Sequence, residues 1–435
     1  MRTTRIASCA PAAVNPKTAP GLCKVILATS LGNGLEIFDF TVFSFFAGVI
    51  GAQFFPVTDS LTSLLMAVGT FGVGFFTWPL GAMVMGVYAD RVGRRAAMTM
   101  SVWLMALGTA VIGLCPSFAT LGIGAPLIVI SGRLLQGFAA GGEVGASTTY
   151  LMEAGPASRR GFLVSWQPAS QGAAALLGAS LGVVLTRTLT PVDLAAWGWR
   201  VPFLVGLLVA PVGLYVRQQL DEIQVPTATA GFARTPLGEL CREHGRKIVL
   251  ATLMLMGSTV LTYVIVYYMP SYLTRVMHMP PTTGYLSAAL SALILLVVSP
   301  LSGLLADRLR RRKPLVLFVF GCNAMLVLPV FRMITHAPST LAVLLGVGVI
   351  STVMALGSGV GLLLLLEAFP ARVRASGLAI PYAFGVTFFG GTAQFVVTWL
   401  IKTTGDPMSA AWYVGVSCFV SFCAILLFSE RRAEP

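Results

Sequence analysis

The sequence predicts an all-α membrane protein with twelve transmembrane helices in two six-helix repeats. Three observations lead to this fold class: the composition, the number of long apolar segments, and two motifs that recur half a chain apart. Of the 435 residues, 56% are hydrophobic and only 10% are charged, whereas soluble domains carry about 25% charged residues. So few polar side chains cannot cover a water-facing surface of this size, which excludes a water-soluble enzyme.

Twelve apolar segments are long enough to cross a bilayer, which takes about 20 residues in a helix. They are 24–50, 62–88, 95–115, 121–150, 161–187, 197–217, 247–275, 282–306, 314–334, 338–366, 374–402 and 409–429. The longest stretch without such a segment is rich in charged side chains and divides the spans six and six. The predicted organisation is a tail (1–21), an N-terminal six-helix bundle (22–217), a linker (218–246), a C-terminal six-helix bundle (247–429) and a second tail (430–435).

The net charge of +13 could indicate a nucleic-acid-binding protein, but the positions of the basic residues argue against one. Of the 29 Lys and Arg, 23 fall in the tails and in alternate loops, five fall in the other loops, and Arg133 lies within a span. An excess of this kind marks the cytoplasmic loops of membrane proteins. We therefore expect a multi-pass protein of the bacterial cytoplasmic (inner) membrane, with the linker and both termini in the cytoplasm, surrounded by lipid bilayer and binding no nucleic acid.

Two motifs recur with nearly equal offsets. The segment GVYADRVGRR (86–95) is matched 217 residues later by GLLADRLRRR (303–312). The pattern E-x-x-P-x-x-x-R at 153–160 returns 214 residues later at 367–374. Two independent motifs at similar offsets indicate a duplicated six-helix unit, and parallel repeats of this kind suit rocking of the two halves about a site at mid-membrane.

The twelve spans and the loop at 86–95 with its copy resemble the major facilitator superfamily. Within it, GNGLEIFDF (32–40), GRLLQGFAAGGE (132–143) and FGGTA (389–393) are similar to signatures of the metabolite:proton symporter branch. The segment SWQPASQ (165–171) and Ile37 most resemble the corresponding residues of citrate and tricarballylate carriers. The resemblance covers essentially the whole chain from about Val25, and it implies a carrier driven by a proton gradient without a cofactor.

Four charged side chains lie well inside the predicted spans: Glu36, Asp39, Arg133 and Glu143. Such groups are costly in lipid unless they are paired or hydrated. All four lie in the first half. At the positions of the second half that correspond to Glu36 and Arg133 by the repeat offset, the residues are apolar. This asymmetry favours a function, while the alternative is an internal ion pair that only locks helix packing.

Glu36 and Asp39 share one helix face, and two close carboxylates in a low dielectric do not both ionise easily. They are therefore predicted to couple transport to protons. Glu143, nearer the cytoplasmic end, is a third proton-coupling candidate or part of a helix interface. Arg133 can hold either an anionic substrate or one of the acids, because a guanidinium binds a carboxylate through two parallel hydrogen bonds.

Amides, hydroxyls and tyrosines in five spans complete the predicted substrate site. Asn33 lies on the same stripe as Glu36, and Gln136 shares a face with Arg133. Such groups recognise carboxylates and hydroxyls, but in membranes they also bond helices to each other or form interfacial aromatic belts. The substrate-binding candidates are Asn33, Arg133, Gln136, Gln167, Ser170, Gln171, Tyr267, Tyr268, Tyr382 and Gln394.

The motif loops lie at the membrane surface and are assigned to gating. A carboxylate beside a helix N-terminus and an Arg would hold two helices together in one state. The resemblance implies that the first-half loop braces the outward-open form, and Arg310 stands in the second copy where the first has Gly93. The gating candidates are Asp90, Arg91, Arg94, Asp307, Arg308, Arg311, Glu153, Arg160, Glu367 and Arg374.

Motifs of other functional classes are missing from the sequence. It has no G-x-x-x-x-G-K-[ST] loop, no cysteine spacing for a metal and no catalytic Ser/His/Asp grouping, so we expect no enzyme activity and no metal. We expect a monomeric, proton-coupled symporter that imports a small anionic carboxylate, such as citrate or a related di- or tricarboxylate. The alternatives are a symporter for betaine, proline or an aromatic acid, a drug exporter, and a transport-fold receptor that does not translocate.

Overall fold

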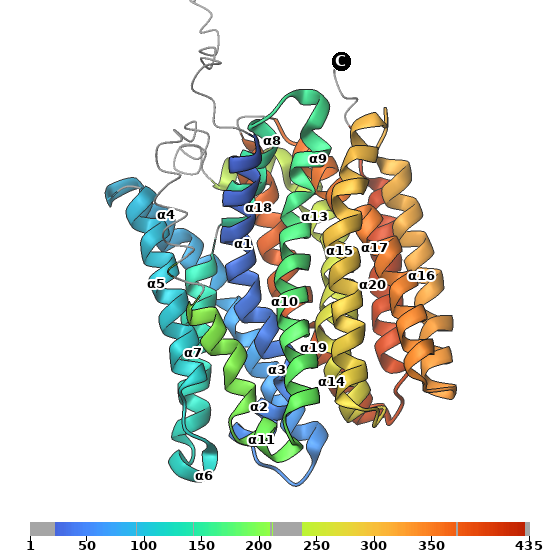
Figure 1. Cartoon of the computed structure of the whole chain (residues 1–435). Helices are drawn as coiled ribbons and strands as arrows, with labels where there is room; N and C mark the ends of the chain where they lie inside the picture. The colour runs from blue at the N-terminus through green and yellow to red at the C-terminus, as the bar shows by residue number, and fades with distance from the viewer. Residues whose placement is uncertain are drawn as a thin grey trace, which may run out of the picture.

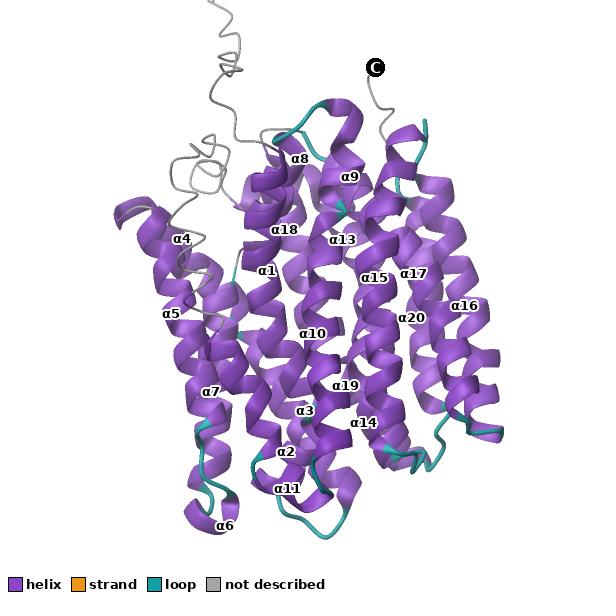
Figure 2. Ribbon diagram, in the orientation of Figure 1, coloured by secondary structure: helices purple, strands orange, loops and turns teal. Residues whose placement is uncertain are grey.

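The computed structural model describes residues 22–92, 94–141, 143–208, 211, 237–370 and 373–430. These residues form helices joined by short loops, with no strand among them (Figures 1 and 2). The long helices run side by side between two faces of the molecule. We call the face at which the first helix begins and the last helix ends the terminal face, and the other the opposite face.

The N-terminal half contains the first six predicted spans. Its elements are α1 (Leu22–Phe45), α2 (Ala47–Phe54), α3 (Ser60–Phe76), α4 (Trp78–Val92), α5 (Arg94–Gly113), α6 (Phe118–Leu121), α7 (Gly124–Ala140), α8 (Glu143–Glu153), η1 (Ala157–Arg159), α9 (Arg160–Val164), α10 (Trp166–Thr188), α11 (Pro191–Ala196) and η2 (Gly198–Arg200). A helix over 201–208 continues from η2.

The C-terminal half contains the other six spans, and two of them include a π-helical segment. Its elements are α13 (Leu237–Thr262), the π-helix η4 (Tyr263–Tyr268), α14 (Met269–Arg275), α15 (Pro281–Arg308), α16 (Lys313–His336), α17 (Thr340–Ala368), α18 (Arg374–Gly385), the π-helix η6 (Val386–Gly390), α19 (Gly391–Thr404) and α20 (Ser409–Leu427).

Nine helical stretches of the described residues are long and apolar enough to cross a membrane. Three shorter apolar helices, Thr99–Gly113, Gly124–Ala140 and Gly198–Leu208, stand where the sequence predicts the third, fourth and sixth spans. The predicted helical membrane fold is confirmed. The tail 1–21 and most of the predicted linker lie outside the described residues.

The start of the seventh span differs from the sequence interpretation. α13 begins at Leu237, so the last part of the predicted linker 218–246 is helical. The charged residues there interrupt the apolar pattern that marks a membrane span, but they do not interrupt a helix. The apolar pattern therefore locates the part of the helix that can lie in lipid, and the helix itself extends further.

Local signals in the chain explain several helix ends. Asp59 accepts hydrogen bonds from the N–H groups of Leu61 and Thr62 at 3.1 and 3.2 Å, and so caps α3. A capping side chain satisfies N–H groups that have no partner within the helix. α19 ends at Gly405, whose φ of 70° is readily adopted only by glycine.

The two halves pack closely along α10 and α15, and along α3 and α19. Glycines allow this approach: a Cβ on Gly172 of α10 would lie 2.6 Å from the Leu296 nitrogen of α15. A Cβ on Gly72 of α3 would lie 2.9 Å from the Gly391 oxygen of α19. Small residues at such contacts let membrane helices approach backbone to backbone, and here they bring the polar residues of both halves within reach of one another.

Candidate functional site

The side chain of Arg133, in α7, is completely buried in the N-terminal half. Its guanidinium carbon lies 3.8 Å from the centre of the Phe43 ring, and the Phe40 and Phe71 rings are 5.6 and 5.9 Å away. Nη2 donates to the backbone carbonyl of Asp39 at 3.4 Å. Nε and Nη1 have no hydrogen-bond partner among the described residues. The ring faces stabilise the cation, and two of its nitrogens remain without an acceptor.

The Asp39 carboxylate ends a short chain of hydrogen bonds through three spans. Gln136 Nε2 donates to Thr109 Oγ1 at 2.8 Å, and the Thr109 hydroxyl donates to Asp39 Oδ2. A Cβ on Gly206 would lie 2.7 Å from Asp39 Oδ1, so the carboxylate also lies close to the sixth span. Asp39 is 5% exposed. A proton exchanged here would change the charge next to Arg133.

The sequence interpretation missed Thr109. It is the only hydroxyl-bearing residue in the apolar stretch 102–114, which is a signal that could have drawn attention to it. Its position opposite Asp39 depends on how α5 packs against α1 and α7, and spacing along the chain does not give this.

Glu36 has neighbours different from those of Asp39. It is buried and close enough to Tyr263 and Tyr382, both in the C-terminal half, for an electrostatic interaction. Asp39 instead faces Thr109 within the N-terminal half. The two carboxylates predicted as a pair therefore lie in two environments, one between the halves and one inside the first half.

Span 5 contributes amides and a hydroxyl beside Glu36. Asn33 Nδ2 donates to Ser170 Oγ at 2.7 Å and to the Gln167 carbonyl at 3.3 Å. Gln171 Nε2 donates to the Tyr382 hydroxyl at 3.4 Å, which joins the two halves. Asn33 Oδ1 is buried without a hydrogen-bond partner among the described residues, and the Gln167 amide is close enough to the Tyr382 hydroxyl to interact with it. An atom such as Asn33 Oδ1 can bind a polar ligand, because leaving it unpaired is costly.

The remaining substrate-binding candidates lie nearer the opposite face. Gln394 Nε2 donates to Ser44 Oγ at 2.7 Å, and the Ser44 hydroxyl donates to the Tyr267 carbonyl at 3.1 Å. Tyr268 shares a hydrogen bond of 2.7 Å with Thr398. Ser44 follows Glu36 by eight residues, or about 12 Å along a helix. The predicted substrate set thus divides into one layer around Glu36 and another around Ser44.

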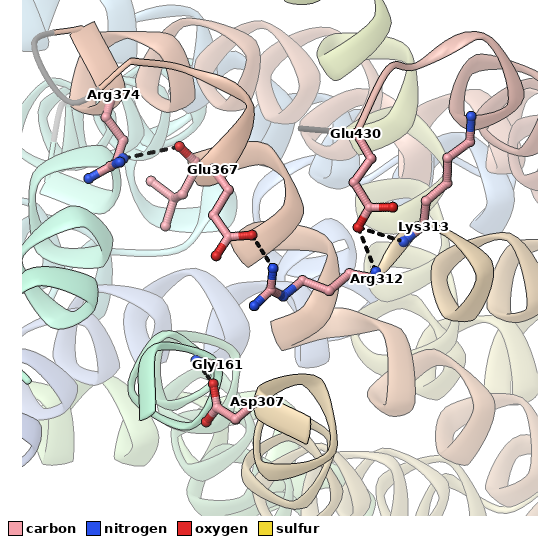
Figure 3. A network of polar contacts seen from close by, with 8 residues as sticks. Gly161, Asp307, Arg312, Lys313, Glu367, Arg374 and Glu430 are labelled. Atoms are coloured by element: carbon pink, nitrogen blue, oxygen red, sulfur yellow. Dashed lines mark hydrogen bonds and ion pairs between the residues drawn. The ribbon is translucent and has the colours of Figure 1, made fainter. Parts of the chain in front are cut away.

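The terminal face carries a network of charged groups (Figure 3). Asp307, at the end of α15, accepts hydrogen bonds from the N–H groups of Gly161 and Phe162 at 2.6 and 2.9 Å, and so caps α9 of the other half. Arg374 and Glu153 form an ion pair of 3.2 Å between α18 and α8. Both contacts join the halves at this face.

Within the same network, Arg312 differs from the predicted gating residues. Arg308 and Arg311 are exposed and form no ion pair with any described residue. Arg312 is 7% exposed and pairs with Glu367 of α17, and its backbone N–H donates to Glu430 at 2.6 Å. The chain turns between α15 and α16, which directs Arg312 inward and leaves the preceding arginines in solvent. Arg312 aligns with Arg95 in the repeat, which was an available signal.

Other predicted residues are placed in part or not at all. The Nε atom of Arg160 is buried without a hydrogen-bond partner among the described residues, and its side chain interacts electrostatically with Glu367. Four further candidates have side chains that lie outside the described residues, and nothing in the structure bears on them. They are Asp90, Arg91, Arg94 and Glu143.

Contacts at the opposite face also join the halves. Arg275 Nη2 donates to the Gly48 carbonyl at 2.9 Å. Lys402 lies 3.1 Å from Asp59 in an exposed ion pair. Hydrogen bonds from Thr62 and Lys402 lower the pKa of the Asp59 carboxyl to about 2. The layers around Glu36 and Ser44 therefore lie between bonded contacts at both faces.

Comparison with known proteins agrees with this architecture. Residues 29–386 match the family model of the Major Facilitator Superfamily. The citrate-proton symporter of Klebsiella pneumoniae is 34% identical over 423 residues, covering 97% of this chain and 94% of that protein. The alpha-ketoglutarate permease of Escherichia coli (strain K12) is 33% identical, covering 93% of each. The proline/betaine transporter of Salmonella typhimurium is 31% identical, covering 95% of this chain and 85% of that protein.

Solved structures show the same fold. A D-xylose-proton symporter superposes with a TM-score of 0.77 at 19% identity, covering 95% of this chain and 99% of that one. The partially occluded inward-open form of the xylose transporter XylE from E. coli gives a TM-score of 0.74 at 19% identity, with the same coverage. Because the family model matches most of this chain, the chain belongs to the major facilitator superfamily.

Proposed function

We propose that this protein is a proton-coupled symporter that imports a small carboxylate, citrate or a related di- or tricarboxylate, by alternating access. The observation that carries the proposal is Arg133, a completely buried cation with two nitrogens that have no acceptor among the described residues. A cation in the membrane interior requires an anion or a hydrogen-bond acceptor. Relatives named for citrate and alpha-ketoglutarate, at 34% and 33% identity, support a carboxylate as that anion.

The position of Asp39 supports the proposed proton coupling. Arg133 donates a hydrogen bond to the Asp39 backbone carbonyl, and the Asp39 carboxylate accepts one from the Thr109 hydroxyl. When Asp39 is ionised, its negative charge neutralises part of the positive charge of Arg133, so the guanidinium attracts a substrate carboxylate less strongly. When Asp39 is protonated, the cation is free to attract a substrate carboxylate. Binding of substrate and of a proton therefore favour each other, which is the reciprocity that symport requires.

The remaining residues take supporting roles in this scheme. Glu36 and Glu143 are further proton-coupling candidates, and Glu36, Asn33, Gln167 and Gln171 form the layer where substrate hydroxyl and carboxylate groups would bind. The terminal face is proposed to be cytoplasmic because 23 of 29 basic residues belong to that side. The proton gradient supplies the energy, and no cofactor is needed.

A symporter for betaine or proline is the second candidate, and relatives with that name support it at 31% and 29% identity. A quaternary ammonium binds to aromatic faces, and Tyr263 lies among the Phe71 and Phe75 rings at 6.1 and 5.7 Å. Those rings pack against one another, and Phe71 also faces Arg133. The cationic group of betaine or proline would be repelled by Arg133. A carboxylate substrate without a cationic group is therefore favoured.

The test is uptake by the purified protein in proteoliposomes. Radiolabelled citrate, alpha-ketoglutarate, betaine and proline are compared with and without an inward proton gradient. We expect the gradient to drive accumulation of one of the two carboxylates. Accumulation of betaine or proline alone would establish the second candidate, and binding of a substrate without uptake would identify a receptor.

A further inference from the structure

A side chain of the last span, α20, forms two hydrogen bonds with the backbone of the seventh span, α13. The Gly257 N–H of α13 donates to Ser421 Oγ of α20 at 2.8 Å, and the Ser421 hydroxyl donates to the Leu253 carbonyl at 2.6 Å. An α-helix normally bonds each N–H to the carbonyl four residues earlier, so Gly257 and Leu253 are each other's regular partners. One side-chain hydroxyl therefore bonds to both members of a single backbone pair.

Close approach of the two helices makes this contact possible. A Cβ on Gly257 would lie 2.5 Å from Ser421 Oγ and 2.9 Å from the Ser417 carbonyl oxygen. Gly257 and Ser421 are both buried. A side chain that inserts into the backbone ladder of a helix is a known cause of local bending. The Ser421 hydroxyl can satisfy both backbone groups when they separate, so opening this turn leaves neither of them unpaired.

The turn lies just before the part of the seventh span that touches the other half. Leu253 and Gly257 are hydrogen-bonded to Ser421 of α20, within the C-terminal half. The π-helix Tyr263–Tyr268 follows, and its Tyr267 carbonyl accepts from Ser44 of the N-terminal half. Tyr263 lies 5.7 Å from Phe75, also in the N-terminal half. If the segment Tyr263–Tyr268 moves with the N-terminal half, the seventh span must change shape between these two attachments. π-helical segments occur frequently at functional sites.

We propose that Ser421 is a positioning residue for transport: its hydroxyl lets the turn Leu253–Gly257 open and close as the segment Tyr263–Tyr268 follows the N-terminal half. Ser421 touches no substrate in this account and acts through α13. The requirement for turn opening during transport rests on the proposed carrier function, whereas the opening itself is a property of the protein alone.

The test compares two substitutions on the same helix. Ser421→Ala removes the bridging hydroxyl, and the regular Gly257-to-Leu253 bond remains for the closed turn. Opening would then leave both groups unpaired, which is costly in a buried position. Ser417→Ala is the matched control, because among the described residues the Ser417 hydroxyl donates to the Tyr413 carbonyl of its own helix and to no other helix.

Hydrogen–deuterium exchange of backbone amides in the seventh span gives a result that does not depend on any substrate. We expect Ser421→Ala to slow exchange of the amides around 253–262 by roughly tenfold, and Ser417→Ala to leave it unchanged. If Ser421 only fastens two helices together, its loss would loosen the contact and speed exchange. Faster or unchanged exchange in Ser421→Ala would overturn the proposal.

Substrate exchange in proteoliposomes tests the consequence for transport. Using whichever substrate the wild type carries, we expect Ser421→Ala to slow exchange roughly tenfold with the substrate Kd unchanged. Normal exchange rates, or a weakened Kd, would show that the turn does not serve transport. If the wild type carries no carboxylate, the proposed function fails, and the amide-exchange result still decides the role of Ser421.

Discussion

The two halves of the molecule share a fold but bury different chemistry. In the described part of the N-terminal half, the buried charged residues are Glu36, Asp39 and Arg133. In the described spans of the C-terminal half, the buried polar groups are neutral, apart from Arg312 near the terminal face. A duplicated fold needs the same apolar pattern twice, and it does not need the charges. The difference supports the proposal that the buried charges serve transport, with proton and anion handled by the first half.

The halves also differ in helix regularity. Among the described residues, π-helical segments occur only in the C-terminal half, at Tyr263–Tyr268 and Val386–Gly390. The first makes a hydrogen bond to Ser44, and Thr387 of the second donates to the Phe75 carbonyl at 3.2 Å. The irregular segments of one half thus contact the other half directly. We infer that the second half deforms while the first half holds the charges.

The largest expected effect comes from the buried cation. Arg133→Lys keeps the charge but loses the planar fork that can bind a carboxylate through two hydrogen bonds. Substrate binding should weaken by about 1.5–3 kcal/mol, the scale of a charged hydrogen bond, which is roughly ten- to a hundredfold in Kd. Calorimetry of the detergent-solubilised protein measures this.

Arg200→Lys is the matched control for that substitution. Arg200 also stacks on an aromatic ring, Trp199, at 4.4 Å and donates to backbone carbonyls, but it lies at the opposite face. Its substitution should leave substrate affinity unchanged. If both variants bind as the wild type does, the first half does not hold the substrate anion through Arg133.

A smaller effect is expected at the terminal face. Asp307→Ala removes the cap of α9, and loss of a helix cap costs about 0.5–2 kcal/mol. The cap joins the halves, so its loss should favour the form that is open at the terminal face and change the rate of exchange by a few-fold, with little change in substrate affinity. An Asp307→Ala affinity as weak as that of Arg133→Lys would place Asp307 in the substrate site instead.

The smallest effect is expected at the exposed pair of Asp59 and Lys402. The folded-state pKa of Asp59 is about 2, below the usual 3.8, so its contribution to stability is complete above the usual value and is lost as the pH falls toward 2. Between about pH 5 and 8 the group does not titrate. Asp59→Asn should change transport by less than about twofold and leave the shape of the pH–rate profile intact. A changed profile would mean that this pair contributes to proton coupling.

The fold could be predicted from the sequence because lipid imposes one simple requirement. Each span needs about 20 apolar residues, and the two repeated motifs identify the duplication without any structure. The start of α13 at Leu237 could not be predicted in this way, since a helix that continues into water shows no apolar pattern. Chain position alone does reveal that Arg133 lies within a span.

The site could be predicted only in part. The sequence identifies which residues are polar within spans, but it does not show which neighbour each one faces. Glu36 and Asp39, three residues apart, have partners in different halves. Thr109 belongs to the site because α5 places its hydroxyl against Asp39. Arg312, and not the predicted Arg311, forms the ion pair with Glu367 because of the turn between α15 and α16. Contacts between distant helices decide the first two cases, and the turn between two consecutive helices decides the third.

In the proposed mechanism, the first half couples substrate to protons through Asp39. The most direct measurement follows proton influx with a pH-sensitive dye inside proteoliposomes while labelled carboxylate enters. The wild type should take up protons with substrate. Asp39→Asn, which keeps an acceptor for Thr109 but cannot carry a charge, should still exchange substrate between loaded faces, with no substrate-dependent proton influx and no accumulation on a pH gradient. Proton influx in Asp39→Asn at the wild-type ratio to substrate would contradict the account.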